Sequence, residues 1–124
     1  MILLDTNILI YLRNGRLNEK SIDLLRSSTL ASCNIIVAEV LGFKLIDRDD
    51  AAYFKGLFES MKNLPFDDAV TEKVIELRQT VNVKLPDAII AATALSNNAE
   101  LWTHNTDDFK AVAGLRLFDP VRVY

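Results

Sequence analysis

Ile2-Leu3-Leu4-Asp5-Thr6-Asn7 places three consecutive apolar residues directly before an acid. A short apolar run is typical of a buried strand, and Asp, Thr and Asn side chains are frequent helix caps. We therefore expect a strand over residues 2–4 that turns at Asp5 into a helix containing residues 8–12. A strand that leads directly into a helix is typical of α/β proteins.

The rest of the chain continues this alternation. Further helices are expected over residues 21–26, 34–45, 51–61, 67–81, 85–95 and 107–112, and further strands over 30–32, 64–66, 101–103 and 115–118. Pro65 confines its strand to a sheet edge, and the apolar helix 85–95 is expected to be central and buried. The predicted fold class is α/β, with a mostly parallel central sheet of about four or five strands and helices on both faces.

The composition fits one domain over residues 1–124. The chain has 124 residues, half of them apolar, and no repeat or linker that would divide it. Its 14 basic and 17 acidic side chains give a net charge of -3, which by itself does not indicate a nucleic-acid-binding protein. A single cysteine, Cys33, excludes an intramolecular disulfide, which is typical of a protein in a reducing compartment. The sequence shows no signal peptide and no membrane span. We therefore expect a cytoplasmic protein with no membrane partner.

Three carboxylates, Asp5, Glu39 and Asp87, stand in or beside apolar segments. A buried, ionised carboxylate is costly unless it is paired or bound to a metal, and no Lys or Arg adjoins Asp5 or Glu39. The three acids therefore suggest one shared cation. In α/β sheets ligands bind beyond the carboxyl ends of the strands, which is where Asp5 is expected.

Ordinary structural roles are the alternative for each of these residues. Asp5 could only cap a helix, Glu39 could lie on a partly solvated helix face, and Asp87 could only favour a helix dipole. Asn105, Asp107 and Asp108 are equally explained as cap and first-turn residues. His104, the only histidine, is expected to be a surface or hydrogen-bonded residue outside the site.

Four segments together resemble the PIN domain family, and within it the VapC-like toxins of toxin-antitoxin pairs. They are Leu4-Asp5-Thr6-Asn7, Glu39, Pro86-Asp87-Ala88-Ile89-Ile90-Ala91-Ala92 and Thr103-His104-Asn105-Thr106-Asp107-Asp108-Phe109. The resemblance spans essentially the whole chain. It implies a PIN-like nuclease domain that cleaves RNA to leave a 3′-hydroxyl and a 5′-phosphate, forms a homodimer and is inhibited by a cognate VapB-like antitoxin protein.

The resemblance also implies a set of site residues. Asp5, Glu39 and Asp87 carry over as metal-binding and catalytic acids. The family often has an acid two residues after the threonine, where this chain has Asn105, so we place Asp107 in the catalytic set and leave Asn105 and Asp108 as alternatives. Thr6, Asn7 and Thr103 are candidates for hydrogen bonds that orient the carboxylates.

Mg²⁺ or Mn²⁺ suits such an all-oxygen site, because both ions prefer carboxylate and water ligands and keep positions open for phosphate oxygens. A bound ion would activate water for attack on phosphorus. Arg13, Arg16 and Lys84 are candidates for contacts with RNA phosphates. The identity of the RNA target lies beyond what these residues indicate.

Two other functions compete with the ribonuclease. A phosphatase of the haloacid-dehalogenase type is disfavoured, because it needs a second aspartate two residues after the first and this chain has Asn7 there. The other alternative is an interaction module whose acids bind a structural ion or a basic peptide. For the toxin, the helix 51–61, which carries Tyr53, Phe54 and Phe58, is the candidate docking surface for a second copy or for the antitoxin.

Overall fold

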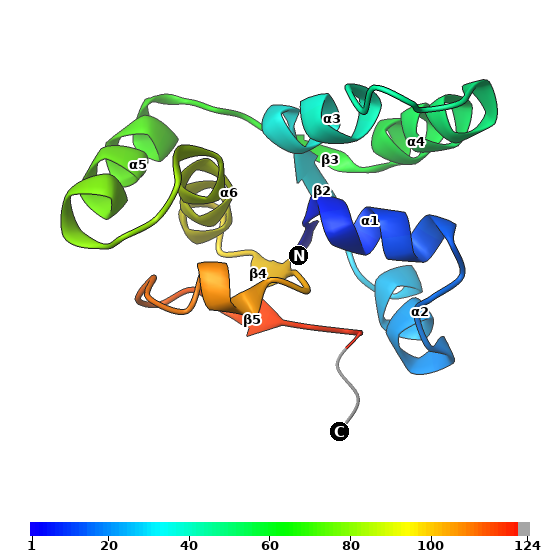
Figure 1. Cartoon of the computed structure of the whole chain (residues 1–124). Helices are drawn as coiled ribbons and strands as arrows, with labels where there is room; N and C mark the ends of the chain where they lie inside the picture. Colours follow the sequence, from blue (N-terminus) through cyan, green and yellow to red (C-terminus); the bar gives the residue numbers. More distant parts are fainter. Residues whose placement is uncertain (122–124) are drawn as a thin grey trace.

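Strand β1 (Ile2–Leu4) is the middle strand of a five-stranded, fully parallel sheet (Figure 1). The computed structural model describes residues 1–121. The strand order is β3-β2-β1-β4-β5, where the other strands are β2 (Leu30–Cys33), β3 (Lys62–Leu64), β4 (Glu100–Trp102) and β5 (Leu117–Phe118). Since all five strands are parallel, their carboxyl ends meet at one edge of the sheet.

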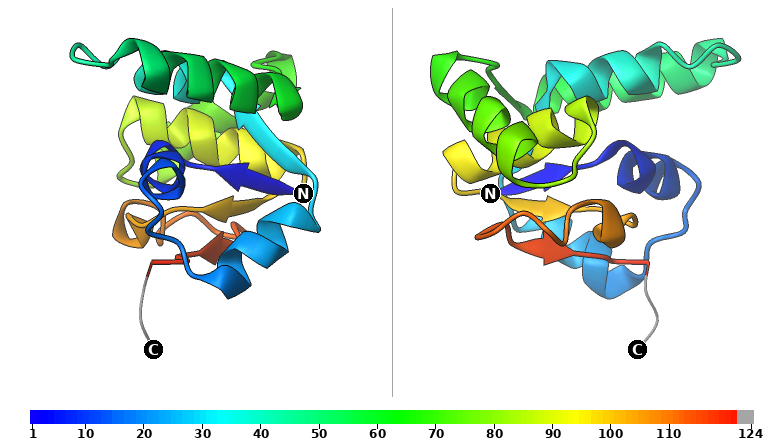
Figure 2. Two further views of the ribbon diagram at one scale, coloured as in Figure 1. Left: turned by 90° about the vertical axis from the view of Figure 1, so that its right-hand side faces the viewer. Right: turned by 60° about the vertical axis from the view of Figure 1, so that its left-hand side comes forward.

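Helices cover both faces of this sheet. They are α1 (Thr6–Arg13), α2 (Glu19–Arg26), α3 (Asn34–Leu41), α4 (Arg48–Ser60), α5 (Asp68–Thr80) and α6 (Leu85–Ser96), with a short 3-10 helix η1 (Thr106–Asp108). Figures 1 and 2 show α1, α2 and α4 on one side of the strands and α5, α6 and η1 on the other. Most of the helices begin at a side-chain cap, as at Asp47 and Asp67, whose carboxylates accept main-chain N–H groups of the first turn.

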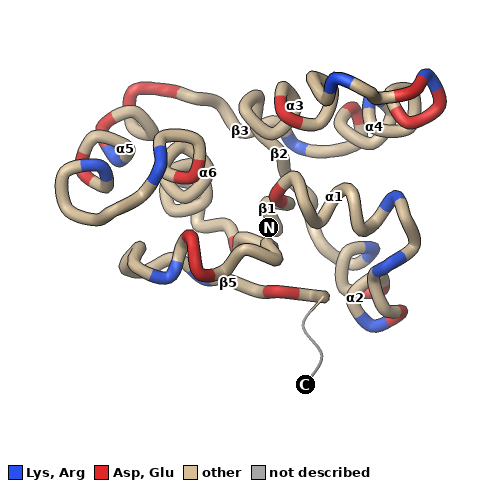
Figure 3. The backbone as a smooth tube through the Cα atoms, in the orientation of Figure 1, with Lys and Arg blue, Asp and Glu red and all other residues tan. Residues whose placement is uncertain are grey.

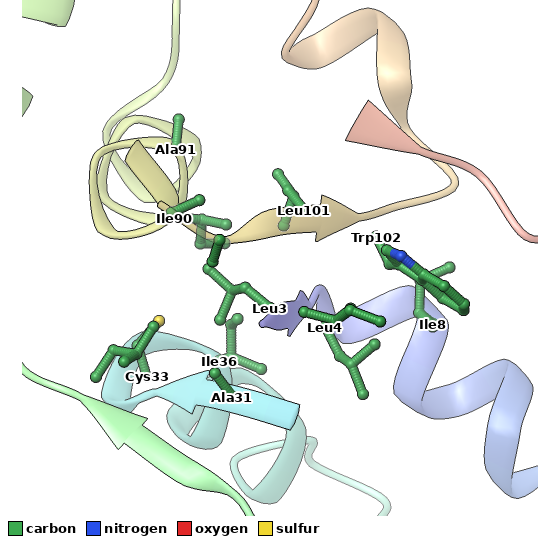
Figure 4. Close-up of a cluster of buried hydrophobic side chains, with 14 of the residues drawn as sticks. Leu3, Leu4, Ile8, Ala31, Cys33, Ile36, Ile90, Ala91, Leu101 and Trp102 are labelled. Atoms are coloured by element: carbon green, nitrogen blue, oxygen red, sulfur yellow. The ribbon is translucent and has the colours of Figure 1, made fainter. Parts of the chain in front are cut away.

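The core lies between the central strands and the helices on each face. Leu3 and Leu4 are fully buried because their strand has a neighbour on each side and helices above and below. Figure 4 shows Leu3, Ile36, Ile90 and other apolar side chains packed around β1. Helix α6 is buried along most of its length, as its apolar sequence predicts.

The predicted fold class is confirmed, and the differences concern element ends. Strand β3 lies at the predicted edge but ends at Leu64, before Pro65. Helix α3 ends at Leu41 instead of residue 45, with Gly42 as its C-cap. Only glycine fits this position, because a Cβ atom there would collide with the carbonyl oxygen of Ala38. The expected helix 107–112 is only the single 3-10 turn η1.

No helix within residues 1–121 is both long enough and apolar enough to cross a membrane.

Leu101→Ala should destabilise the fold strongly, because Leu101 is fully buried on β4. We expect a loss of about 2 to 5 kcal/mol in the free energy of unfolding, measured by urea denaturation. The matched control is Leu45→Ala, whose side chain is 81% exposed and whose loss should stay within about 0.5 kcal/mol. Equal losses in the two variants would contradict this assignment of the core.

Candidate active site

Asp5 lies where β1 ends and α1 begins, and it is only 6% exposed. Its Oδ1 accepts the main-chain N–H of Thr6 at 2.8 Å, so Asp5 does cap the helix. Its Oδ2 accepts the hydroxyl of Thr103 at 2.8 Å, and Thr103 follows the neighbouring strand β4. The carboxylate is therefore held between two strand ends, at the edge of the sheet where ligands bind in this fold class.

Three further acids come to this edge from three different helices: Glu39 from α3, Asp87 from the first turn of α6 and Asp108 from η1. Figure 3 shows acidic segments from α3, α6 and η1 around the end of β1. We call Asp5, Glu39, Asp87 and Asp108 the acid cluster. It contains all three acids that the sequence singled out as metal ligands.

The acids of the cluster influence one another electrostatically. Burial raises the pKa of Asp5, and the negative charge of Asp108 raises it further. The hydrogen bonds from Thr103 and Thr6 act in the other direction and lower this pKa. Burial likewise raises the pKa of Glu39, and the charges of Asp5 and Asp87 add to this effect. The pKa of Asp87 is raised by burial, by Asp108 and by Asp5, and is lowered by Lys84. The negative charges that raise the pKa of Asp5, Glu39 and Asp87 also make this a site that attracts cations.

The three candidates for the fourth position differ in their surroundings. Asp108 is the one whose charge acts on both Asp5 and Asp87. The side chain of Asp107 is 90% exposed and lies 3.6 Å from the ammonium group of Lys110. Asn105 is exposed, and its main-chain N–H donates to the hydroxyl of Thr103 at 3.1 Å.

Thr103, Asn7 and Thr6 hold the site in different ways. The hydroxyl of Thr103 links the turn 103–105 to Asp5. Asn7 accepts the main-chain N–H of His104 at 3.0 Å, so it fastens the same turn to α1 without contacting a carboxylate. The hydroxyl of Thr6 is close enough to Glu39 to lower the pKa of that acid, but it is buried and makes no hydrogen bond of ordinary geometry.

The donor set fits a hard divalent cation. The acid cluster offers only oxygen atoms, and the unpartnered hydroxyl of Thr6 is free to bond a carboxylate or a water of a hydrated ion. Within residues 1–121, no group of three or more His, Cys, Asp or Glu side chains is arranged to hold a metal ion as it stands. Glu39 is exposed and Asp87 is half-buried, so a cation can reach both carboxylates from solvent.

Sequence reasoning missed the pairing of His104 with Asp119. The ring Nδ1 of His104 lies 3.0 Å from Oδ2 of Asp119, an acid that is 7% exposed. The two residues are 15 positions apart, so no local spacing reveals the pair. Strand pairing could have indicated the contact, because His104 follows β4 and Asp119 follows the adjacent parallel strand β5.

These features define an α/β domain with a cluster of acids at the carboxyl edge of its sheet. The family model of the PIN domain matches residues 2–115. The chain therefore belongs to the PIN domain family, whose members are generally nucleases and typically use divalent metals.

Solved structures of toxin-antitoxin complexes are similar to this chain along its whole length. A toxin-antitoxin complex from Klebsiella pneumoniae has 31% identity and a TM-score of 0.79 over 99% of this chain and 100% of that one. VapBC-1 from nontypeable Haemophilus influenzae has 27% identity and a TM-score of 0.82 over 98% and 100%. VapBC2 from Rickettsia felis, bound to a DNA fragment from its promoter, has 25% identity and a TM-score of 0.79 over 95% and 98%.

These solved structures show that, within the PIN domain family, the chain resembles the toxins of VapBC pairs, as its motifs predicted. A comparison with curated proteins gives no match.

The raised pKa of Asp87 makes stability depend on pH. Between the unfolded and folded pKa values the folded chain binds more protons, so its stability falls as the pH rises through this window. In EDTA, Asp87→Asn should therefore raise the Tm near pH 7, and this gain should shrink as the pH falls toward about 4. Differential scanning fluorimetry measures both effects.

Asp107→Asn is the control for this experiment, because Asp107 is almost fully exposed and its charge is not among those that raise the pKa values of the acid cluster. It should leave the Tm unchanged at each pH. A wild-type protein as stable as Asp87→Asn at neutral pH would show that the cluster does not repel Asp87.

Proposed function

We propose that this chain is a single PIN-like nuclease domain, over residues 1–124, that acts as a Mg²⁺- or Mn²⁺-dependent endoribonuclease of the VapC type. The observation that carries the proposal is the convergence of Asp5, Glu39, Asp87 and Asp108 at the carboxyl edge of the sheet. Membership of a family of nucleases supports it. The acids come from four separate elements, so their meeting is a property of the fold and not of one local motif.

Each acid has a role in this proposal. Asp5, fixed by Thr6 and Thr103, is the central ligand, and Glu39 and Asp87 complete the metal-binding set. A divalent cation would supply Lewis-acid activation of water and neutralise charge on the phosphate oxygens. We propose Asp108 as the fourth acid in preference to Asp107, since only Asp108 acts on Asp5 and Asp87.

The site argues against a phosphatase of the haloacid-dehalogenase type. That chemistry needs an acid at position 7, and the side chain of Asn7 is already occupied by the main chain of His104. RNA as the substrate follows from the family resemblance, and the expected products carry a 3′-hydroxyl and a 5′-phosphate. A homodimer and a cytoplasmic location remain predictions.

Purified protein, free of any partner, should cleave a mixed RNA pool with Mg²⁺ or Mn²⁺ and lose this activity in EDTA. Asp5→Asn should retain the fold, because an amide oxygen can still accept the N–H of Thr6, but its rate should fall by at least about 10². Gel electrophoresis of labelled RNA measures cleavage. Full activity of Asp5→Asn would refute the metal site, and turnover of a phosphomonoester without RNA cleavage would favour a phosphatase.

Asp108→Asn and Asp107→Asn form a matched pair in the same assay, because they make the same change at adjacent positions. Only Asp108→Asn should lower the rate strongly. The reverse order would assign the fourth position to Asp107.

A cavity beside the acid cluster supports a protein partner. It measures about 320 Å³ and lies between α1, α3 and α4; its lining includes Thr6, Ile10, Glu39, Phe43, Leu45 and Phe54. Phe43 and Leu45 are 64% and 81% exposed, so apolar side chains stand open to a ligand here. We propose that an apolar segment of a cognate VapB-like antitoxin fills this cavity, in keeping with the toxin-antitoxin complexes that this chain resembles.

Glu39 explains how such a partner would inhibit the enzyme. This acid lines the cavity and also belongs to the acid cluster, so a segment bound in the cavity would reach the active site. A basic side chain on that segment would be attracted by the four carboxylates. Helix α4, whose aromatic residues the sequence marked as a docking surface, contributes Phe54 to the cavity wall.

Phe43→Glu should abolish inhibition by the cognate antitoxin without lowering RNA cleavage, because it places a charge on the apolar wall. Titration of the antitoxin into the cleavage assay measures the effect. Phe66→Glu is the matched control, since Phe66 is also exposed, at 54%, and does not line the cavity. Equal inhibition of wild type and Phe43→Glu would exclude this docking site.

A further inference from the structure

Helix α1 has a half-buried side between the residues that face the core and those that line the cavity, and Tyr11 on this side packs against the core. The helix buries Ile8 and Leu9 and lines the cavity with Thr6, Ile10, Arg13 and Asn14. Asn7 and Tyr11, four residues apart, share the remaining side. They meet His104 and Arg16 there, and we call Asn7, Tyr11, Arg16 and His104 the α1 strip.

His104 is held in place by three contacts. Its main-chain N–H donates to Asn7 at 3.0 Å, its ring Nδ1 lies 3.0 Å from Asp119, and its ring meets that of Tyr11 edge to face with centroids 5.6 Å apart. The side chain is nevertheless 42% exposed. Because Asp119 engages Nδ1, the nitrogen left for a ligand is Nε2.

Asp119 is a fixed partner for the His104 ring. It is 7% exposed, and its second oxygen accepts the main-chain N–H of Val121 at 3.0 Å, which fixes the carboxylate. Its Oδ2 engages the ring on the Nδ1 side and so sets the orientation of the ring.

Arg16 adds a cation to the same strip. Its guanidinium carbon lies 5.1 Å from the centre of the Tyr11 ring, and within residues 1–121 it forms no ion pair with an acid. Arg13 differs, because it donates to Asp50 at 2.9 Å and also lies over Tyr53. Figure 3 shows basic segments on the connection from α1 to α2.

The α1 strip adjoins the acid cluster. His104 is bonded to Thr103, whose hydroxyl holds Asp5, and Asn7 stands two residues after Asp5. A polyanion that enters the acid cluster is repelled by any carboxylate charge not neutralised by a cation, so neighbouring cations are needed to hold its other phosphates. The strip provides Arg16 for this on the side of α1 next to the one that lines the cavity.

We propose that the α1 strip binds the phosphate backbone of the RNA substrate next to the scissile bond, with Arg16 and His104 as the phosphate contacts and Asp119 as the positioning residue of His104. This inference rests on the proposed ribonuclease function and names where that site holds its substrate. It also gives two neighbouring sides of α1 different ligands, with RNA on one side and a protein segment on the other.

Two substitutions test the contacts while they keep the local structure. His104→Asn removes Nε2 but offers an amide N–H to Asp119 in place of Nδ1–H. Arg16→Gln removes only the charge over Tyr11. Arg26→Gln makes the same charge change on α2, outside the strip, and serves as the matched control.

The probe is a fluorescein-labelled, single-stranded RNA oligonucleotide of mixed sequence, and Asp87→Asn is the background that suppresses cleavage. Fluorescence anisotropy with Mg²⁺ gives the Kd over a range of salt concentrations. Arg16→Gln should lower the slope of log K against log salt by about 0.7, the value for one phosphate contact on a single strand, and weaken binding about fivefold at about 0.1 M salt. His104→Asn should also weaken binding, because it removes Nε2, and Arg26→Gln should match the background protein.

A purely structural role for the strip would change the Tm but not the salt slope. The proposal is overturned if Arg16→Gln and His104→Asn both retain the affinity and slope of the background protein. Cleavage that wild type performs and EDTA abolishes would still stand in that case, so the strip can fail without the ribonuclease function. If wild type cleaves no RNA, the ribonuclease function fails, whatever the binding assay shows.

Discussion

The hydrogen bond from Thr103 to Asp5 joins two strand ends and fixes the centre of the site. It runs between residues 98 positions apart, and it exists only because β1 and β4 are parallel neighbours that end at the same edge. The buried carboxylate is thus satisfied on both oxygens, by Thr6 and by Thr103. Around this fixed acid lie Glu39, Asp87 and Asp108, each from a separate helix.

The ionised acids of the site lower the stability of the fold. Burial and mutual repulsion raise the pKa of Asp5, Glu39 and Asp87 together, so each ionised acid makes the others less favourable. A fold selected for stability alone would not bring these charges to one edge. The hydrogen-bonded turn 103–105 and the apolar core on either side of β1 hold them there, which is the arrangement that a cation-binding active site requires.

Helix α1 organises what surrounds the acids. Asp5 caps its first turn, one side lines the apolar cavity with α3 and α4, and the neighbouring side carries the α1 strip. Glu39 lies where cavity and acid cluster meet, so occupation of the cavity and access to the acids are linked through one side chain. Inhibitor and substrate would then approach the same four carboxylates from different sides of one helix.

The sequence by itself determined the alternation of strands and helices and the edge position of β3, because apolar runs and proline are local signals. It also singled out Asp5, Glu39 and Asp87 as candidate ligands, because charges in apolar segments are a local signal too. Element ends were less well predicted, as at Gly42, which caps α3 four residues before the predicted end at residue 45. The sequence did not separate Asp108 from Asp107, because no spacing rule says which of two adjacent residues in a 3-10 turn acts on Asp5; in the structure the charge of Asp108 raises the pKa of Asp5, while Asp107 lies beside Lys110. The pairing of His104 with Asp119 was likewise decided by strand register, which brings together residues that the sequence keeps apart.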